Sequence, residues 1–164
     1  MSRALSSTLS GTRLFAATGL ASLAAVAAAL VSQHVFDIQP CPWCVLQRVI
    51  FVAIALAALP GWLVRAPALR RAAAAAMLLG AACGAAAALW QHFVAASSTT
   101  CTLSLADRIV SALALDALAP SVFAAYASCA DAAVKLLGVP YEFWSLALFI
   151  ALGGAAVVLL RRPV

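Results

Sequence analysis

Four long apolar stretches constrain the fold of this chain more than any other feature of its 164 residues. They cover about residues 14–33, 44–64, 72–94 and 141–160, and a helix needs about 20 apolar residues to cross a bilayer. Only 9% of the residues are charged, whereas soluble domains carry about 25%. Because an open sheet would leave backbone groups unpaired in lipid, we expect helices. The sequence therefore predicts an all-α membrane protein, a four-helix transmembrane bundle forming one domain over residues 1–164.

The charged residues fall on opposite sides of these stretches. Seven of the ten basic residues precede the first stretch, follow the fourth or join the second to the third (Arg3, Arg13, Arg65, Arg70, Arg71, Arg161, Arg162). All five acidic residues belong to the other side (Asp37, Asp107, Asp116, Asp131, Glu142). Because arginine-rich segments stay in the cytoplasm, we expect both termini there and the connections at about 34–43 and 95–140 outside. Short clusters beside apolar runs do not indicate nucleic-acid binding, in spite of the net charge of +5.

A cleaved signal peptide is the alternative interpretation of the first stretch, which has a basic start and many alanines. Its apolar core is longer than the roughly 7–15 residues of a signal peptide. Cleavage would also leave three spans and put Arg161 and Arg162 on the wrong side. We therefore expect this stretch to be a membrane span.

The second outer connection is long for a loop without function. Within it, Leu103–Leu118 has apolar residues at helical spacing and polar residues mostly on other faces, which predicts a short amphipathic helix. Such a helix lies either on the membrane surface or against the bundle, and the sequence favours neither. In the third stretch, Gly80 and Gly84 form a small-xxx-small pair, which predicts close helix packing.

Four of the five cysteines lie in the outer connections: Cys41, Cys44, Cys101 and Cys129. Disulfides persist outside the cytoplasm, so these four can form two pairs, with three connectivities. Two disulfides that only brace the loops are one interpretation. A structural zinc site is another, but no histidine lies at ligand spacing near Cys101 or Cys129, so we expect no metal. Cys83 lies in the middle of the third stretch, where we expect an inert packing residue.

The Cys41-Pro42-Trp43-Cys44 segment is better suited to thiol exchange than to support, because a bridge across two residues constrains little chain entropy. Pro42 suits the first position of a helix, which puts Cys41 near the N-cap and Cys44 in the first turn. The partial positive charge of the helix start favours a thiolate there. Arg48 follows one turn later on the same face. A charge inside a span is costly, so we favour a functional Arg48 over one that merely reaches for the interface.

His92 lies at the outer end of the third stretch, at a depth similar to that of Arg48. A thiolate, an arginine and a histidine at one depth suit a lipid-soluble electron acceptor. The arginine can stabilise charge on a carbonyl oxygen, and the histidine can form a hydrogen bond with it. An interfacial polar residue without this role is the other interpretation of His92.

Several segments together resemble the disulfide bond formation protein B (DsbB) family. Gln33-His34-Val35, Pro40–Cys44 and Gln47-Arg48 are similar to its first outer loop, and Cys101 and Cys129 match its second loop pair. The segment from Cys129 through Pro140 to Trp144 is similar to the approach to its fourth helix. The resemblance extends from about Leu14 to Leu160.

The resemblance implies a quinone-coupled thiol oxidase of a bacterial inner membrane, with its active cysteines in the periplasm. Its partner would be a periplasmic thioredoxin-fold oxidase of the DsbA type, and its acceptor ubiquinone or menaquinone. The Cys101–Cys129 disulfide would take the partner's electrons and pass them to Cys41–Cys44. Cys44, Arg48 and His92 would then face the quinone. Some members carry an acid where Gln47 stands, so a possible salt bridge to Arg48 is absent.

Two other functions stay open at this point. One is an enzyme similar to vitamin K epoxide reductase, also a membrane enzyme that couples thiols to a quinone. There the loop cysteines precede the Cys-x-x-Cys pair, whereas here they follow it, which counts against this function. The other is a non-enzymatic membrane protein with structural disulfides.

Overall fold

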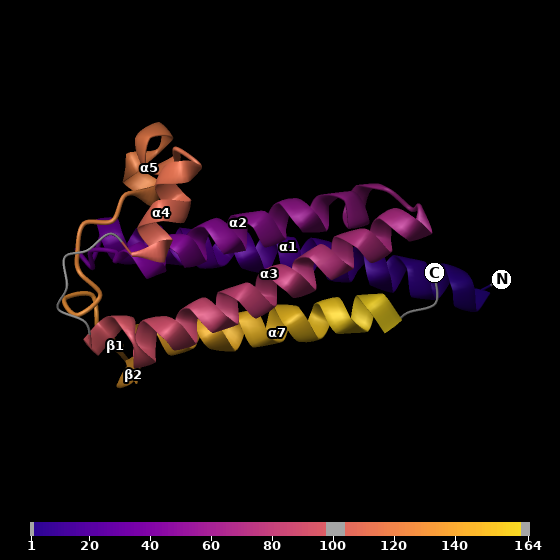
Figure 1. The fold of residues 1–164 in the computed structure, drawn as a ribbon. Coiled ribbons are helices and arrows are strands. Elements are labelled where there is room, and N and C mark those ends of the chain that lie inside the picture. Colours follow the sequence, from indigo (N-terminus) through magenta and orange to yellow (C-terminus); the bar gives the residue numbers. More distant parts are fainter. Residues whose placement is uncertain (1, 98–103, 162–164) are drawn as a thin grey trace.

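The computed structural model describes the backbone of residues 2–97 and 104–161, and the side chains from residue 11 onward within those ranges. Four of the described helices are long and apolar enough to cross a membrane. They are α1 (Ser2–His34), α2 (Pro42–Leu63), α3 (Pro67–Phe93) and α7 (Tyr141–Arg161), and they run side by side along the molecule (Figure 1). The predicted helical membrane fold is confirmed.

The helices extend beyond some of the predicted spans. α1 begins at Ser2 and α3 at Pro67, whereas the apolar stretches begin at about residues 14 and 72. Hydropathy marks the part of a helix that suits lipid, and the helix itself continues until a residue stops it. Pro42 and Pro67 each occupy the first turn of their helix, because proline has no N–H to leave unpaired there.

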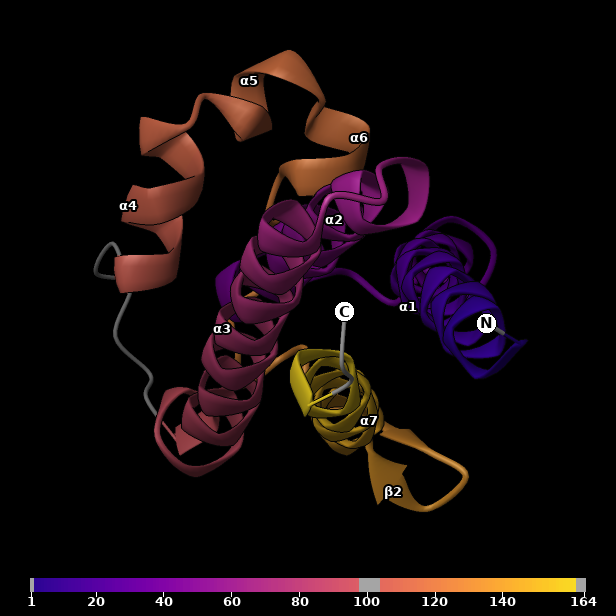
Figure 2. The ribbon, with the colours of Figure 1, turned by 90° about the vertical axis from the view of Figure 1, so that its right-hand side faces the viewer.

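The helices pack in the order α1, α2, α3, α7, so that α1 and α7 have little direct contact (Figure 2). Glycines allow the close approaches between them. A Cβ on Gly84 would overlap the ring of Phe149 on α7, and a Cβ on Gly80 would lie 2.9 Å from Ile54 on α2. The Phe149 ring stacks on Phe51, with centroids 4.1 Å apart. The close packing predicted from the two glycines of α3 is therefore present.

Cys83 is exposed on α3, so the prediction that it serves as a packing residue is wrong. The buried positions of this helix follow one stripe at helical spacing, which includes Ala74, Met77, Ala81 and Gly84. Cys83 falls outside that stripe. In an alanine-rich span both faces are apolar, so hydropathy alone did not show which face is inside.

The start of α1, the end of α7 and the connection between α2 and α3 lie together at one end of the bundle (Figure 1). Arg65, Arg70 and Arg71 belong to that end. The opposite end carries the shorter elements: η1 (Ala95–Ser97), α4 (Leu105–Ala112), α5 (Leu115–Leu118), α6 (Pro120–Phe123), β1 (Lys135–Leu136) and β2 (Val139–Pro140). The fold thus separates the arginine-rich end from the cysteine-bearing end. Which of them faces the cytoplasm stays a prediction from the charges.

The amphipathic segment of the outer connection forms a shorter helix than Leu103–Leu118, the range expected from its pattern. α4 starts with a capping box between Ser104 and Asp107 and stops at Ala112, because Ala114 adopts a left-handed conformation (φ 52°). The Ser111 hydroxyl donates to Asp116 across this turn (2.7 Å). α4 packs against α2 and buries its small side chains at Ala106 and Val110, so in this structure it lies on the bundle.

Candidate active site

The Cys41–Cys44 pair sits at the start of α2, as predicted. Cys41 is the N-cap residue, with extended backbone angles, and Pro42 follows in the first turn. The two sulfur atoms lie 2.7 Å apart, and the Cys44 backbone N–H donates to Cys41 Sγ (3.3 Å). Cys41 is fully buried, whereas Cys44 is partly exposed. The helix start therefore holds both sulfurs in contact and gives them different surroundings.

Cys129 reaches the same place from the second outer connection. The backbone N–H groups of Tyr126 and Ala127 donate to the Pro40 carbonyl (3.0 and 3.2 Å), which fastens the segment before Cys129 to the segment before Cys41. Cys41 and Cys129 pack in one cluster with the Trp43 side chain. The Cys129 sulfur accepts hydrogen bonds from the Cys41 side chain and the Trp43 backbone. The structure thus brings two of the predicted loop cysteines together.

These contacts give the Cys41 and Cys129 thiols different pKa values. The hydrogen bonds with Cys129 and Cys44, together with burial, raise the pKa of the Cys41 thiol far above its ordinary value. The hydrogen bond from Cys41 lowers the pKa of Cys129, against the opposing effect of burial. Cys129 is therefore the more readily ionised of the pair, and the thiolate is the nucleophile in thiol–disulfide exchange.

Cys44 turns toward a different neighbour, Gln91 near the end of α3. The Gln91 side-chain amide donates to Cys44 Sγ (3.3 Å), and the Gln47 amide donates to Gln91 Oε1 (2.7 Å). Both glutamines are buried. Gln91 was missed as a site residue in the sequence, where its only signal is an uncharged polar side chain inside an apolar stretch. Gln91 therefore links Gln47 to Cys44 through two hydrogen bonds between uncharged side chains.

Arg48 is buried, with 5% of its surface exposed, and it links three elements. Its Nη1 donates to Gln33 Oε1 on α1 (2.7 Å) and to the Val122 carbonyl of α6 (2.9 Å), and its Nη2 donates to the Ala29 carbonyl (3.4 Å). Among the described residues, these partners are all uncharged. The guanidinium is therefore fixed in place without a carboxylate to neutralise it, and it can attract a partly negative oxygen.

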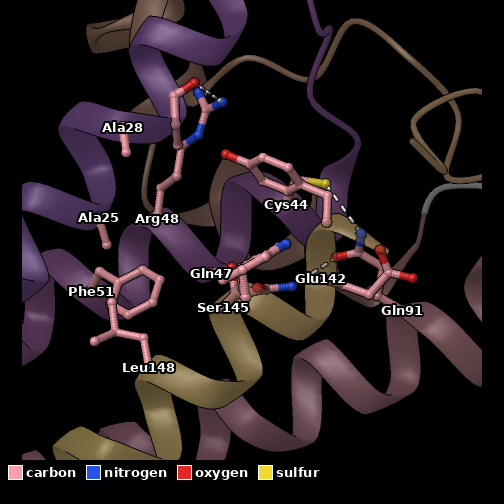
Figure 3. A pocket seen from close by; sticks show the side chains of 13 residues that line it. Ala25, Ala28, Cys44, Gln47, Arg48, Phe51, Gln91, Glu142, Ser145 and Leu148 are labelled. Atoms are coloured by element: carbon pink, nitrogen blue, oxygen red, sulfur yellow. Dashed lines mark hydrogen bonds between the residues drawn. The ribbon is translucent and has the colours of Figure 1, made fainter. Parts of the chain in front are cut away.

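Cys44 and Arg48 both line a cavity of about 200 Å³ between α1, α2 and α7 (Figure 3). The small side chains of the α1 alanines leave this space unfilled, and the side chains of Phe51 and Leu148 form an apolar wall. Polar groups gather on the remaining lining, which comprises Cys44, Gln47, Arg48, Gln91, Tyr141, Glu142 and Ser145. A mostly apolar cavity with a few convergent polar groups is typical of a small-molecule site.

Glu142 lines this cavity, whereas His92 does not line it and instead contacts Glu142. His92 Nδ1 and Glu142 Oε1 are 2.6 Å apart, which joins the last turn of α3 to the first turn of α7. The sequence shows Glu142 only as an acid at the edge of the fourth stretch, and nothing local marks it as a site residue. Cys101, the remaining predicted site residue, lies outside the described residues.

Comparison with known proteins agrees with this arrangement. The sequence model of the family "Disulfide bond formation protein DsbB" matches residues 11–159. Disulfide bond formation protein B 1 of Pseudomonas aeruginosa is 32% identical over 92% of this chain and 95% of its own length. The Herminiimonas arsenicoxydans protein B is 33% identical, over 83% of this chain and 86% of its own, and that of Stutzerimonas stutzeri is 34% identical, over 91% and 94%.

These matches cover nearly the whole chain and join its apolar helices to bacterial relatives named for disulfide bond formation. They identify an oxidoreductase of disulfide formation that crosses the bacterial inner membrane several times. The chain belongs to the disulfide bond formation protein B (DsbB) family.

Proposed function

We propose that this protein is a quinone-dependent thiol oxidase. It re-oxidises a periplasmic dithiol oxidase of the DsbA type and passes the electrons to a membrane quinone. The observation that carries this proposal is the continuous line of sulfur atoms from Cys129 through Cys41 to Cys44, which ends at a cavity beside Arg48. Electrons entering at the outer connection can leave into the bilayer along this line.

The thiol side begins at Cys101, whose role rests on the family resemblance. A thiolate of the partner attacks the Cys101–Cys129 disulfide at Cys101, forms a mixed disulfide and releases Cys129. Cys129, which packs against Cys41, then attacks Cys41 of the Cys41–Cys44 disulfide. Cys44 is the leaving group, and it leaves toward the cavity. The second thiol of the partner then resolves the mixed disulfide and frees Cys101, which attacks Cys129 of the Cys41–Cys129 disulfide and releases Cys41. The Cys41 and Cys44 thiols would give their two electrons to the acceptor as their disulfide forms again.

The residues around the cavity fit a quinone head group. Ubiquinone or menaquinone would supply an acceptor of two electrons that is soluble in the bilayer. Phe51 and Leu148 offer a flat apolar surface to a ring, while Arg48 offers positive charge to a carbonyl oxygen. The Gln91 amide holds the Cys44 sulfur at the edge of the same space.

The orientation of the protein follows from the arginines. Arg65, Arg70 and Arg71 lie at the end opposite the cysteines, and short arginine-rich segments stay in the cytoplasm. We therefore infer that both termini are cytoplasmic and that Cys41, Cys44, Cys101 and Cys129 lie at the periplasmic face. There they can meet a soluble periplasmic partner.

The test uses the purified protein in lipid nanodiscs with a reduced DsbA-type partner. We expect oxidation of the partner only when ubiquinone or menaquinone is supplied, and none by Cys44→Ser. Cys83→Ser is the matched control, because Cys83 is exposed on α3 and takes part in none of the proposed exchanges, and it should keep full activity. Equal oxidation without quinone, or unchanged activity of Cys44→Ser, would contradict the proposal.

A second variant separates the two halves of the proposed reaction. Cys101→Ser should block exchange with the partner and leave quinone binding unchanged. If Cys101→Ser also loses quinone binding, the second cysteine pair is structural rather than redox-active.

A further inference from the structure

We propose that His92 and Glu142 form a proton relay from the outer end of the bundle to the cavity beside Cys44. This inference rests on the proposed quinone-dependent function and adds a proton pathway to it. Glu142 Oε1 and His92 Nδ1 are 2.6 Å apart, within the range for direct proton transfer. The glutamate is buried, with 5% of its side chain exposed, whereas 32% of the histidine side chain is exposed. The pair therefore spans the boundary between the interior and the surface.

The two ends of the relay face different surroundings. Glu142 lines the cavity together with Cys44 and Gln91, and Figure 3 shows these side chains near one another. The His92 ring packs against Phe93 and Phe143, with centroids 4.8 and 4.6 Å away, which holds Nδ1 toward the carboxylate. Within the described part of the chain, His92 Nε2 bonds to no protein group, so it is available to water. Histidine is the side chain best suited to exchange protons near neutral pH.

The proposed reaction needs such a pathway. Overall, a dithiol and a quinone give a disulfide and a quinol, so two electrons and two protons move. The thiols of the partner lose their protons outside the cavity as they become thiolates, whereas the quinol oxygens gain theirs inside it. In the relay, the Glu142 carboxyl would give one proton to a quinone oxygen, His92 would restore that proton to Glu142, and water would restore the proton of His92. A second passage through the same two residues would supply the second proton of the quinol. No further oxidant or reductant is required.

Few other side chains of the cavity can supply this proton. Arg48 does not deprotonate in proteins, and the amides of Gln47 and Gln91 are not acids. The Cys44 sulfur is the electron donor. The remaining candidate is Tyr141, whose hydroxyl donates to Ser32 Oγ on α1 (3.3 Å). Tyr141→Phe removes that hydroxyl and tests it directly.

A purely structural role is the competing explanation, since the pair joins α3 to α7. These two helices already pack closely along their length through Gly84 and Phe149. A fastening role predicts that any variant able to keep the hydrogen bond behaves like the original. A relay predicts that variants keeping the hydrogen bond but unable to carry a proton still fail.

The experiment uses the full chain in nanodiscs. Exchange with the reduced partner is measured on the oxidised chain, and quinol formation is measured after ubiquinone is added to the chain reduced at its cysteines. Glu142→Gln and His92→Asn both keep a polar group in place, with the Asn amide standing in for Nδ1. We expect each to bind ubiquinone and to exchange with the reduced partner as the original does, but to form quinol about 100-fold more slowly, the lower range for general acid catalysis. Asp116→Asn is the matched control, because this half-buried carboxylate accepts from the Ser111 hydroxyl, outside the site.

Two further readouts distinguish a relay from a structural link, and the first of them is spectroscopic and needs no reaction rate. Infrared difference spectra taken on ubiquinone reduction should contain a carboxyl band that disappears in Glu142→Gln. Free imidazole should restore quinol formation in His92→Ala, because it can replace the missing ring, and should have no effect on His34→Ala. A restored rate is expected if a ring that carries a proton is needed at this position.

Several outcomes would overturn the relay. They are an unchanged rate of quinol formation in Glu142→Gln, a rate loss matched by an equal loss of ubiquinone affinity, failure of imidazole to act on His92→Ala, or a carboxyl band that persists in Glu142→Gln. The same rate loss in Tyr141→Phe alone would assign the proton to Tyr141 instead. If the original protein oxidises its partner without quinone, the proposed function fails, and the relay fails with it. Relay failure alone leaves quinone-dependent oxidation by the original protein intact.

Discussion

Cys129 lies against Cys41 at the start of α2 and shares a hydrogen bond with it. The two thiols come from different outer connections, and the backbone bonds to the Pro40 carbonyl and the packing of both cysteines with Trp43 hold them in contact. While both residues are thiols, their hydrogen bond raises the pKa of Cys41 and lowers the pKa of Cys129. Four predictions follow from this contact and from the packing around it.

When Cys44 and Cys101 are both replaced, Cys41 and Cys129 should form a disulfide with each other. In Cys44→Ser combined with Cys101→Ser, the nearest sulfur for either remaining thiol is the other one. We expect mild oxidation to join Cys41 to Cys129, measured by mass spectrometry of non-reduced peptides. The exposed Cys83 provides the internal control, and predominant pairing of Cys129 with Cys83 would contradict the described arrangement.

The reactivity of Cys129 should depend on Cys41. The hydrogen bond from Cys41 lowers the pKa of Cys129, so more of it is thiolate at a given pH. In a reduced Cys101→Ser background, Cys41→Ala should therefore raise that pKa and shift the pH profile of Cys129 alkylation by iodoacetamide upward. An unchanged or lowered midpoint would show that the hydrogen bond does not govern ionisation.

Arg48→Lys should weaken quinone binding even though the charge is kept. One ammonium cannot replace a planar guanidinium that bonds Gln33, Ala29 and Val122 at once, so the charge would no longer be held at the cavity. We expect affinity for ubiquinone to fall about 10- to 100-fold, the loss typical of a hydrogen bond to a charged group. Equilibrium titration measures it, and Arg65→Lys at the opposite end serves as the control. Equal ubiquinone affinity of Arg48→Lys and Arg65→Lys would show that Arg48 does not contribute to quinone binding.

Gly84→Ala should destabilise the bundle, because its new Cβ would overlap the ring of Phe149. Overpacking of this kind costs about 1–3 kcal/mol. Gly154→Ala on α7 is the matched control, since a Cβ there meets no atom within 4 Å. Unfolding of both variants in mixed micelles gives the comparison. Equal stability would mean that α3 and α7 are less closely packed than described.

Much of the architecture could be predicted because it depends on local chemistry. Each apolar stretch must form a helix in lipid to pair its own backbone groups. Pro42 starts α2 and thereby puts Cys41 at the N-cap and Cys44 in the first turn, as the sequence suggests. Arg48 then follows one turn later on the same face. These relationships join neighbours in the chain, so residue order is enough to define them.

The remaining site depends on contacts between distant segments. Gln91 reaches Cys44 from α3, Gln33 reaches Arg48 from α1, and Glu142 places its carboxylate between His92 and the cavity. Each contact requires a particular rotation of one helix against another. In alanine-rich spans the inner and lipid-facing surfaces are equally apolar, so the sequence pattern does not encode that rotation, as Cys83 shows.

The sequence by itself thus determined the helices, their number in the membrane and the cysteine pair at the start of α2, because bilayer thickness and helix capping act on short segments. Only the tertiary structure decided that Cys129 meets Cys41 and that Glu142, rather than His92, faces the cavity. The physical reason is that close packing at glycines such as Gly84 sets how the helices turn toward one another, and that rotation selects which side chains meet.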